Sequence, residues 1–67
     1  MEEKHYEIVK SRNPFAKQKW FWRFWAANGK EIAKSSENYL HREGAEHSIS
    51  LINGKKCPVY ENGKLVG

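Results

Sequence analysis

The run of residues 20–27 constrains the fold of this chain more than any other feature. Apart from Arg23, it contains only aromatic residues and alanines, and Asn28-Gly29 follows it directly. Aromatic residues favour strands, and Asn-Gly between two such segments is the strongest short-range signal for a hairpin. The run therefore predicts a central strand, with residues 30–35 as the antiparallel return strand.

Two further elements complete the expected fold. Residues 5–10 alternate, with Tyr6 and Ile8 on one side, which predicts a strand ahead of the hairpin. From about residue 40 to 53 the period becomes helical, and Asn53-Gly54 is a helix stop. We expect an α+β fold, a three-stranded antiparallel meander packed on one helix (βββα). The apolar stripe of that helix would consist of Leu40, Ala45, Ser48, Ile49 and Ile52.

The chain of 67 residues predicts a single domain over 1–67, with a core at about 5–53 and a tail at 54–67. In the tail, Asn62-Gly63 separates two short apolar pairs, which predicts either a small hairpin or one extended segment. A domain of this size buries only about 60% of its unfolded surface. Cys57 is the single cysteine, which excludes an internal disulfide and indicates a reducing compartment. We therefore expect self-association to stabilise the fold.

The N-terminal residues are charged, and the mean hydropathy is −0.88. We therefore expect a cytoplasmic protein without a signal peptide or membrane segment.

The central strand has an apolar surface on both faces. We assign Trp20, Trp22 and Phe24 to the face under the helix, which leaves Phe21 and Trp25 facing outward. Each of these two rings buries about 150–250 Å² when covered, so an uncovered pair forgoes several kcal/mol. We expect the outer face to meet a second copy of the chain, a nucleic acid or another protein, or else the tail to fold back over it. The candidate interface residues are Val9, Phe21, Trp25, Ile32 and Tyr60.

The register of the return strand depends on the turn. A two-residue turn at Asn28-Gly29 places Ile32 and Lys34 on the outer face and Ala33 beneath the helix. A three-residue turn with a bulge would instead move Ile32 to the core face. We favour the two-residue turn.

Charge is unevenly distributed along the chain. The net charge is +4, but residues 10–34 contain seven basic residues and only one acidic residue, Glu31. This asymmetry is compatible with a polyanion-binding face, as well as with an ordinary solvated surface. A second hypothesis is therefore nucleic-acid binding by the sheet face and the loop at 11–19. The candidate contacts are Arg12, Phe15, Lys17, Lys19, Arg23, Lys30 and Lys34.

No motif indicates catalysis. His41 and His47 are six residues apart and cannot form an i, i+4 metal pair on a helix, and Cys57 has no second cysteine. No paired carboxylates fall on an apolar surface, and the sequence has no glycine-rich phosphate loop. We expect a non-enzymatic protein with no metal, no cofactor and no small-molecule substrate.

The run Trp22-Arg23-Phe24-Trp25-Ala26-Ala27-Asn28-Gly29-Lys30-Glu31-Ile32-Ala33 resembles the signature hairpin of the YegP-like family of bacteria and archaea. Tyr6-Glu7-Ile8 is similar to the opening strand of that family, and Tyr39, Ala45, Glu46 and Ile49 are similar to its helix pattern. The resemblance implies a βββα unit that occurs as tandem pairs or as homodimers, with C-terminal strands that can be exchanged.

With one copy in this chain, the resemblance implies a homodimer that associates through its sheet or its C-terminal strand. It supplies no activity and no catalytic residue. The chain departs from the family pattern at Phe21 and Trp25, where family members usually have polar residues.

Overall fold

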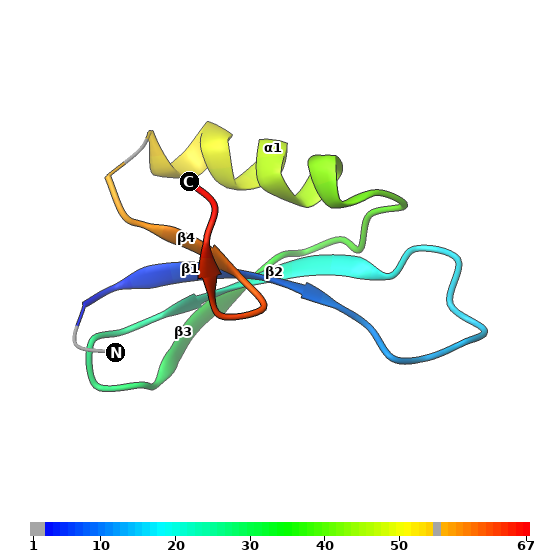
Figure 1. Ribbon diagram of the computed structural model, residues 1–67, viewed down its shortest axis with the longest axis horizontal. Coiled ribbons are helices and arrows are strands. Elements are labelled where there is room, and N and C mark those ends of the chain that lie inside the picture. The colour runs from blue at the N-terminus through cyan, green and yellow to red at the C-terminus, as the bar shows by residue number, and fades with distance from the viewer. Residues whose placement is uncertain (1–2, 55) are drawn as a thin grey trace.

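The computed structural model describes residues 3–54 and 56–67 and has one helix on a five-stranded sheet (Figure 1). The spatial order of the strands is β3-β2-β1-β4-β5. The elements are β1 (His5–Lys10), β2 (Trp20–Trp25), β3 (Glu31–Lys34), α1 (Arg42–Asn53), β4 (Val59–Glu61) and β5 (Lys64–Leu65). The expected α+β class is confirmed, and β1, β2 and β3 form the expected meander. The sheet is nevertheless larger and mixed, because β4 pairs with β1 in parallel.

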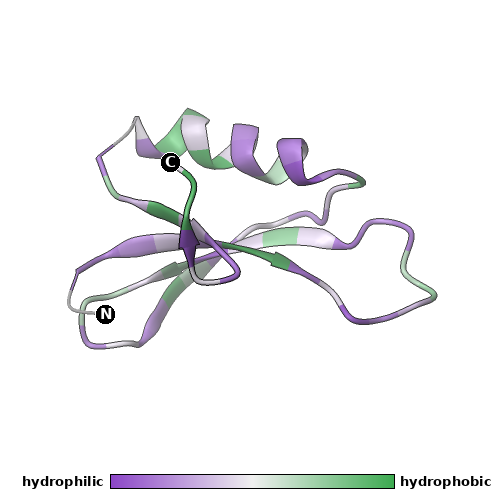
Figure 2. Ribbon diagram, viewed as in Figure 1, coloured by the Kyte–Doolittle hydropathy of each residue, from purple (hydrophilic) through white to green (hydrophobic). Residues whose placement is uncertain are grey.

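The helix covers the face of the sheet to which we assigned it. In the pairing of β1 with β2, Tyr6 lies opposite Phe24 and Ile8 opposite Trp22. Tyr6, Ile8 and Trp22 belong to the buried core with Ala45 and Ile49 of α1, and the partly buried Phe24 packs against it. Figure 2 shows both hydrophobic and hydrophilic positions along α1. The assignment of Trp20, Trp22 and Phe24 to the inner face is confirmed.

Specific contacts fix the packing of this core. The rings of Tyr6 and Phe24 are stacked with centroids 4.4 Å apart, and Tyr6 meets Trp22 edge-on at 5.5 Å. The indole Nε1–H of Trp22 donates to Ser48 Oγ at 3.1 Å. The hydroxyl of Ser48 therefore satisfies the one polar group that this indole brings into the core.

The apolar stripe of the helix was predicted only in part. Ala45 and Ile49 are buried, but Leu40 and Ile52 are exposed. Leu40 precedes the first helical residue, so it does not share the helical periodicity. At the other end, Asn53 rather than Ile52 is buried.

The amide of Asn53 directs the chain from α1 towards β4. Its Nδ2–H donates to the carbonyl of Cys57 at 2.8 Å, and its Oδ1 accepts from the N–H of Cys57 at 2.9 Å. Gly54 ends the helix in the left-handed region with φ 54°. A buried polar side chain thus has both of its hydrogen-bonding groups satisfied while it shapes the turn.

The tail forms a small hairpin, one of the two expected alternatives. Tyr60 of β4 lies opposite Leu65 of β5, and both turn residues, Asn62 and Gly63, have positive φ. Since β4 lies beside β1, the hairpin extends the sheet. The alternative in which the tail folds back over the outer rings is therefore wrong.

The expected two-residue turn between β2 and β3 is also wrong. The N–H of Gly29 donates to Ala26 O at 3.0 Å and the N–H of Ala26 donates to Lys30 O at 2.8 Å, which defines a three-residue loop. A β-bulge beside Phe24 then shifts the pairing of β2 with β3 by one residue, so that Ala33 lies opposite Phe24. Glu31 lies opposite Trp25, and Ile32 becomes the extra residue. Ala33 is exposed rather than beneath α1.

Candidate functional site

Phe21 lies on the outer face of β2. We expected its ring to be uncovered there, but it is buried. Phe21 lies opposite Val9 and points outward as predicted, but only 8% of it is accessible. Lys34 Nζ lies 4.8 Å from the ring centroid and Arg23 Cζ 5.5 Å from it. Long basic side chains can lay their aliphatic stems on an apolar surface while their charged heads stay in water. The chain therefore covers this ring by itself.

Trp25, the second outer ring, is half-buried and has polar partners. Its indole Nε1–H donates to Glu7 Oε1 at 3.1 Å, and Arg23 Cζ lies 5.9 Å from its ring centroid. Arg23 Nε also lies 3.2 Å from Glu31 Oε1. The outer face therefore combines aromatic rings with charged side chains of both signs.

The structure brings most of the candidate interface residues together. Tyr60 lies opposite Glu7 on the same outer face, where His5 meets its ring edge-on at 5.5 Å. Val9, Phe21, Trp25 and Tyr60 thus share one face. Ile32 stands apart, at the bulge of edge strand β3, and is 53% exposed.

The strand β3 is an uncovered edge that the sequence did not point to. All four of its residues are exposed. Among the described elements, α1 packs on β1 and β2 but does not reach β3. Leu51 and Ile52 of α1 are also exposed. The narrow apolar stripe of the helix was the sequence signal for this uncovered edge, because a helix with a narrow apolar stripe cannot cover every strand of a wide sheet.

The loop between β1 and β2 holds its shape through its own hydrogen bonds. The N–H of Ser11 donates to Lys19 O at 2.7 Å, which closes the base of the loop. Asn13 Oδ1 accepts from the N–H of Phe15 at 3.0 Å, and Asn13 O accepts from the N–H of Ala16 at 3.2 Å. This turn presents the Phe15 ring to solvent with 92% of the residue exposed.

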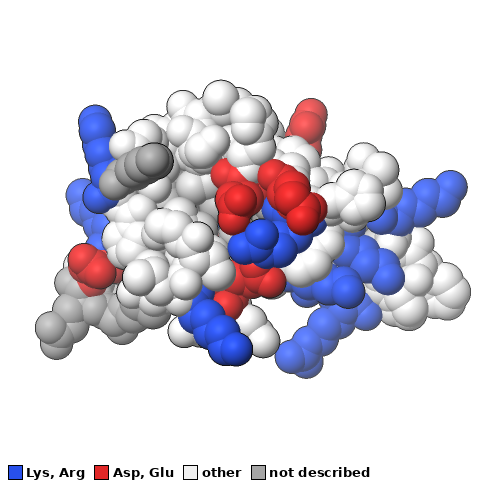
Figure 3. Space-filling view, turned by 45° about the horizontal axis from the view of Figure 1, so that its top comes forward, with Lys and Arg blue, Asp and Glu red and all other residues white. Residues whose placement is uncertain are grey.

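The candidate nucleic-acid contacts fall into three groups. Arg12, Phe15, Lys17 and Lys19 lie in the loop, which projects beyond α1 at one end of the molecule (Figure 1). Basic side chains gather at that end in Figure 3, whereas acidic ones occupy the middle of the same view. Arg23 and Lys34 lie on the outer face. Lys30 follows the turn between β2 and β3.

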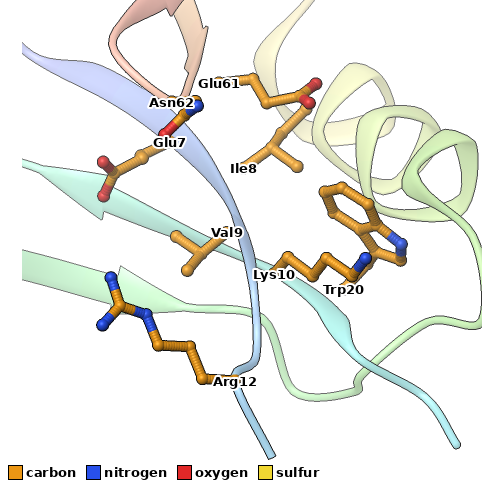
Figure 4. Close-up of a pocket in the computed structure, with 8 residues that line it drawn as sticks. All are labelled: Glu7, Ile8, Val9, Lys10, Arg12, Trp20, Glu61 and Asn62. Carbon is orange, nitrogen blue, oxygen red and sulfur yellow. The ribbon is translucent and has the colours of Figure 1, made fainter. Parts of the chain in front are cut away.

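A cleft of about 360 Å³ lies at the base of the loop (Figure 4). Lys10 Nζ lies 5.6 Å from the centroid of Trp20, and the two side chains form one wall. Residues of both faces of β1 line the cleft, so it opens along the edge of the strand. Its lining comprises Glu7, Ile8, Val9, Lys10, Arg12, Trp20, Glu61 and Asn62. The sequence did not identify Lys10 and Trp20 as residues that line a surface cleft.

A family model described as a domain of unknown function (DUF1508) matches residues 16–56. The chain belongs to the DUF1508 family. The resemblance to the YegP-like family is thereby confirmed, because that family is the DUF1508 domain. No curated protein and no solved structure matches the chain. The matched region of this DUF1508 domain spans β2, β3 and α1.

Arg42 attaches α1 of the DUF1508 domain to the C-terminal hairpin and also forms an ion pair within the helix. Arg42 Nε donates to Glu61 Oε1, and Arg42 Nη2 lies 3.1 Å from Glu46 Oε2. The hydrogen bond to Glu61 raises the pKa of Arg42, so its guanidinium stays charged. Glu61, at the border of the cleft, is therefore already paired with a cation.

The described residues of this DUF1508 domain contain no group of three His, Cys, Asp or Glu side chains placed to hold a metal ion. Burial raises the pKa of the Tyr6 hydroxyl, and the nearby Cys57 adds to the shift. Tyr6 belongs to the core and does not face a cavity. In the same part of the chain, no helix is both long and apolar enough to cross a bilayer.

Proposed function

We propose that this DUF1508 domain is a non-catalytic interaction module that forms a homodimer through the edge of β3. The observation that carries the proposal is that β3 is an exposed strand edge, and that α1 does not cover it. An edge strand presents unpaired backbone N–H and C=O groups, which are a template for pairing with another strand. Two copies related by a two-fold axis would pair β3 with β3 and continue the sheet from one copy to the other.

The apolar side chain of Ile32 supports the same surface, because it is half exposed in the strand itself. A standard interface buries about 800 Å² per partner, which four strand residues alone do not supply. Contacts outside β3 would add the area that the strand lacks.

Two observations favour β3 over the surfaces that the sequence indicated. Phe21 is already buried by Lys34 and Arg23 of its own chain, so it has little left to gain from a partner. The hairpin of β4 and β5 is already paired with β1 of its own chain, so its exchange between copies would add no new strand pairing.

Sedimentation velocity at rising protein concentration tests this proposal. We expect a monomer–dimer equilibrium that Ile32→Lys weakens at least tenfold, because a charge on an edge strand opposes pairing. Leu65→Lys is the matched control, because Leu65 is 64% exposed on the opposite edge strand and should leave the equilibrium unchanged. A monomer at every concentration, or equal effects of the two variants, would contradict the proposal.

Nucleic-acid binding by the outer sheet face is less well supported. Arg23 and Lys34 lie over Phe21, and Glu7 and Glu31 belong to the same face and would repel phosphates. The loop between β1 and β2 carries no acidic residue and differs from the sheet face in this respect.

A further inference from the structure

We propose that the basic loop between β1 and β2, together with the cleft at its base, binds single-stranded nucleic acid. The site consists of two aromatic platforms, Phe15 at the tip and Trp20 at the base, with four basic residues around them. These are Lys10, Arg12, Lys17 and Lys19. The proposal is independent of dimerisation through β3.

The position of Phe15 is the first observation that carries the proposal. It is the most exposed of the large apolar side chains in the described residues, at 92%. Its backbone is nevertheless ordered, because Asn13 Oδ1 accepts from its N–H and Asn13 N–H donates to Ser11 Oγ at 3.2 Å. Asn38 Nδ2 supports the far side of the loop by donating to Gln18 O at 3.3 Å. An aromatic ring held in water by a fixed turn is preorganised for stacking on a planar ligand.

The charge of the loop is the second observation. No acidic residue occurs between Glu7 and Glu31. In the part of the chain that the structure describes, the ion pairs of Arg and Lys involve Arg23 and Arg42, and none involves a loop residue. The charges of Arg12, Lys17 and Lys19 therefore remain available for phosphate groups, as the basic end of Figure 3 illustrates.

The cleft supplies the second platform. The strand β4 ends at Glu61, opposite Ile8, so β4 does not flank Val9 and Lys10. The half-buried Trp20 ring lines the resulting cleft beside Lys10, and Arg12 lies at its loop end (Figure 4). Of the two carboxylates in the lining, Glu61 is paired with Arg42, and Glu7 lies at the end of the cleft away from Arg12 (Figure 4).

The spacing of the two platforms suits a short single strand. Phe15 and Trp20 are five positions apart in the sequence, so their backbones are at most about 18 Å apart. At 3.4 Å per nucleotide, about five stacked nucleotides cover that distance. Unpaired bases expose their faces to aromatic side chains, whereas bases in a duplex are stacked on one another.

A single strand fits this surface better than an anionic membrane does. Membrane-surface binding scales with buried apolar area, and Phe15 is the only large apolar residue of the loop. The second ring, Trp20, lies within a cleft, where a flat bilayer surface cannot reach it. A flexible polymer that alternates planar bases with phosphates can contact both rings and the cations between them.

Fluorescence anisotropy with a labelled 20-nucleotide mixed-sequence single-stranded DNA tests the proposal. If the four basic residues each neutralise one phosphate, the slope of log K against log salt will be about −3. We expect Phe15→Ala to weaken binding at least fivefold, the effect of about 1 kcal/mol per lost base stack, and Phe15→Trp to retain it. Replacement of both Lys17 and Lys19 by Gln should make the slope shallower by about 1.4.

Matched controls separate this site from general attraction between a basic protein and DNA. Leu51→Ala removes another exposed apolar side chain, and Lys30→Gln removes a basic residue outside the loop; neither should change the affinity beyond twofold. Three results would each overturn the proposal. They are no binding at 20 mM salt, equal effects of Phe15→Ala and Leu51→Ala, and binding to phosphatidylserine vesicles without binding to the oligonucleotide.

Discussion

The two faces of β2 bury their aromatic rings by different means. On the inner face, α1 covers Trp22 with Ala45 and Ile49, which are almost completely inaccessible to water. On the outer face, no helix is present, and Phe21 is covered by Lys34 and Arg23 of the same sheet. Both rings end with less than a tenth of their surface accessible.

This difference shows that an aromatic outer face does not by itself require a partner. A helix supplies cover from a distant part of the chain and excludes water through close packing. Basic side chains of neighbouring positions supply cover locally, and their charged heads keep the face soluble. The two kinds of cover should differ in strength, and the three predictions below test that difference.

The largest effect is expected from Ile49→Ala, which opens a cavity beneath α1. Ile49 is 1% exposed and lies in the core cluster, so its truncation should cost about 2–5 kcal/mol in the free energy of unfolding. Urea denaturation followed by tryptophan fluorescence measures this change. Leu51→Ala on the exposed side of α1 is the control and should stay within about 0.5 kcal/mol. Equal costs for the two variants would contradict the packing of α1 on β2.

A smaller effect is expected from Lys34→Ala, which removes one of the two basic side chains that lie over the ring of Phe21. The ammonium group lies 4.8 Å from the ring centroid, and exposed cation–π contacts contribute about 0.5–1 kcal/mol. Lys34→Met keeps an aliphatic chain of similar length without the charge. If the stem provides most of the cover, Met should recover most of the loss in urea denaturation. A loss equal to that of Ile49→Ala would mean that the two faces are not covered differently.

The sequence predicted the faces of the meander because alternation is a local property. Trp22 and Phe24 lie on the same side of any regular strand, and the pairing of β1 with β2 needs no other information. The burial of Phe21 was not predicted. The sequence placed Lys34 on the outer face, as observed, but alternation does not show that its side chain reaches over the ring. The position of Ile32 was not predicted because it depends on a bulge, which inserts one residue and leaves no clear signature in composition.

The place of β4 was not predicted for a related reason. The Asn62-Gly63 turn indicates a hairpin, but it does not say which strand that hairpin joins. Parallel pairing of β4 with β1 connects segments about fifty residues apart and depends on the turn that Asn53 builds after α1. In the candidate nucleic-acid site, the sequence pointed to Phe15 and its basic neighbours. It could not show that Trp20 lines a cleft, because the cleft exists only where β4 stops.

The smallest effect concerns pH and the buried hydroxyl of Tyr6 on the inner face. Burial raises the pKa of Tyr6 above its ordinary value near 10, so the folded state retains the phenolic proton to higher pH than the unfolded state does. The contribution of Tyr6 to stability is therefore complete below pH 10 and is lost as pH rises through the folded-state pKa. Tyr6→Phe should flatten the decline in the free energy of unfolding above about pH 10, measured by urea denaturation at a series of pH values. If Tyr6→Phe left the decline unchanged, the hydroxyl of Tyr6 would not be desolvated under α1, and the inner cover would be looser than the packing of Ala45 and Ile49 implies.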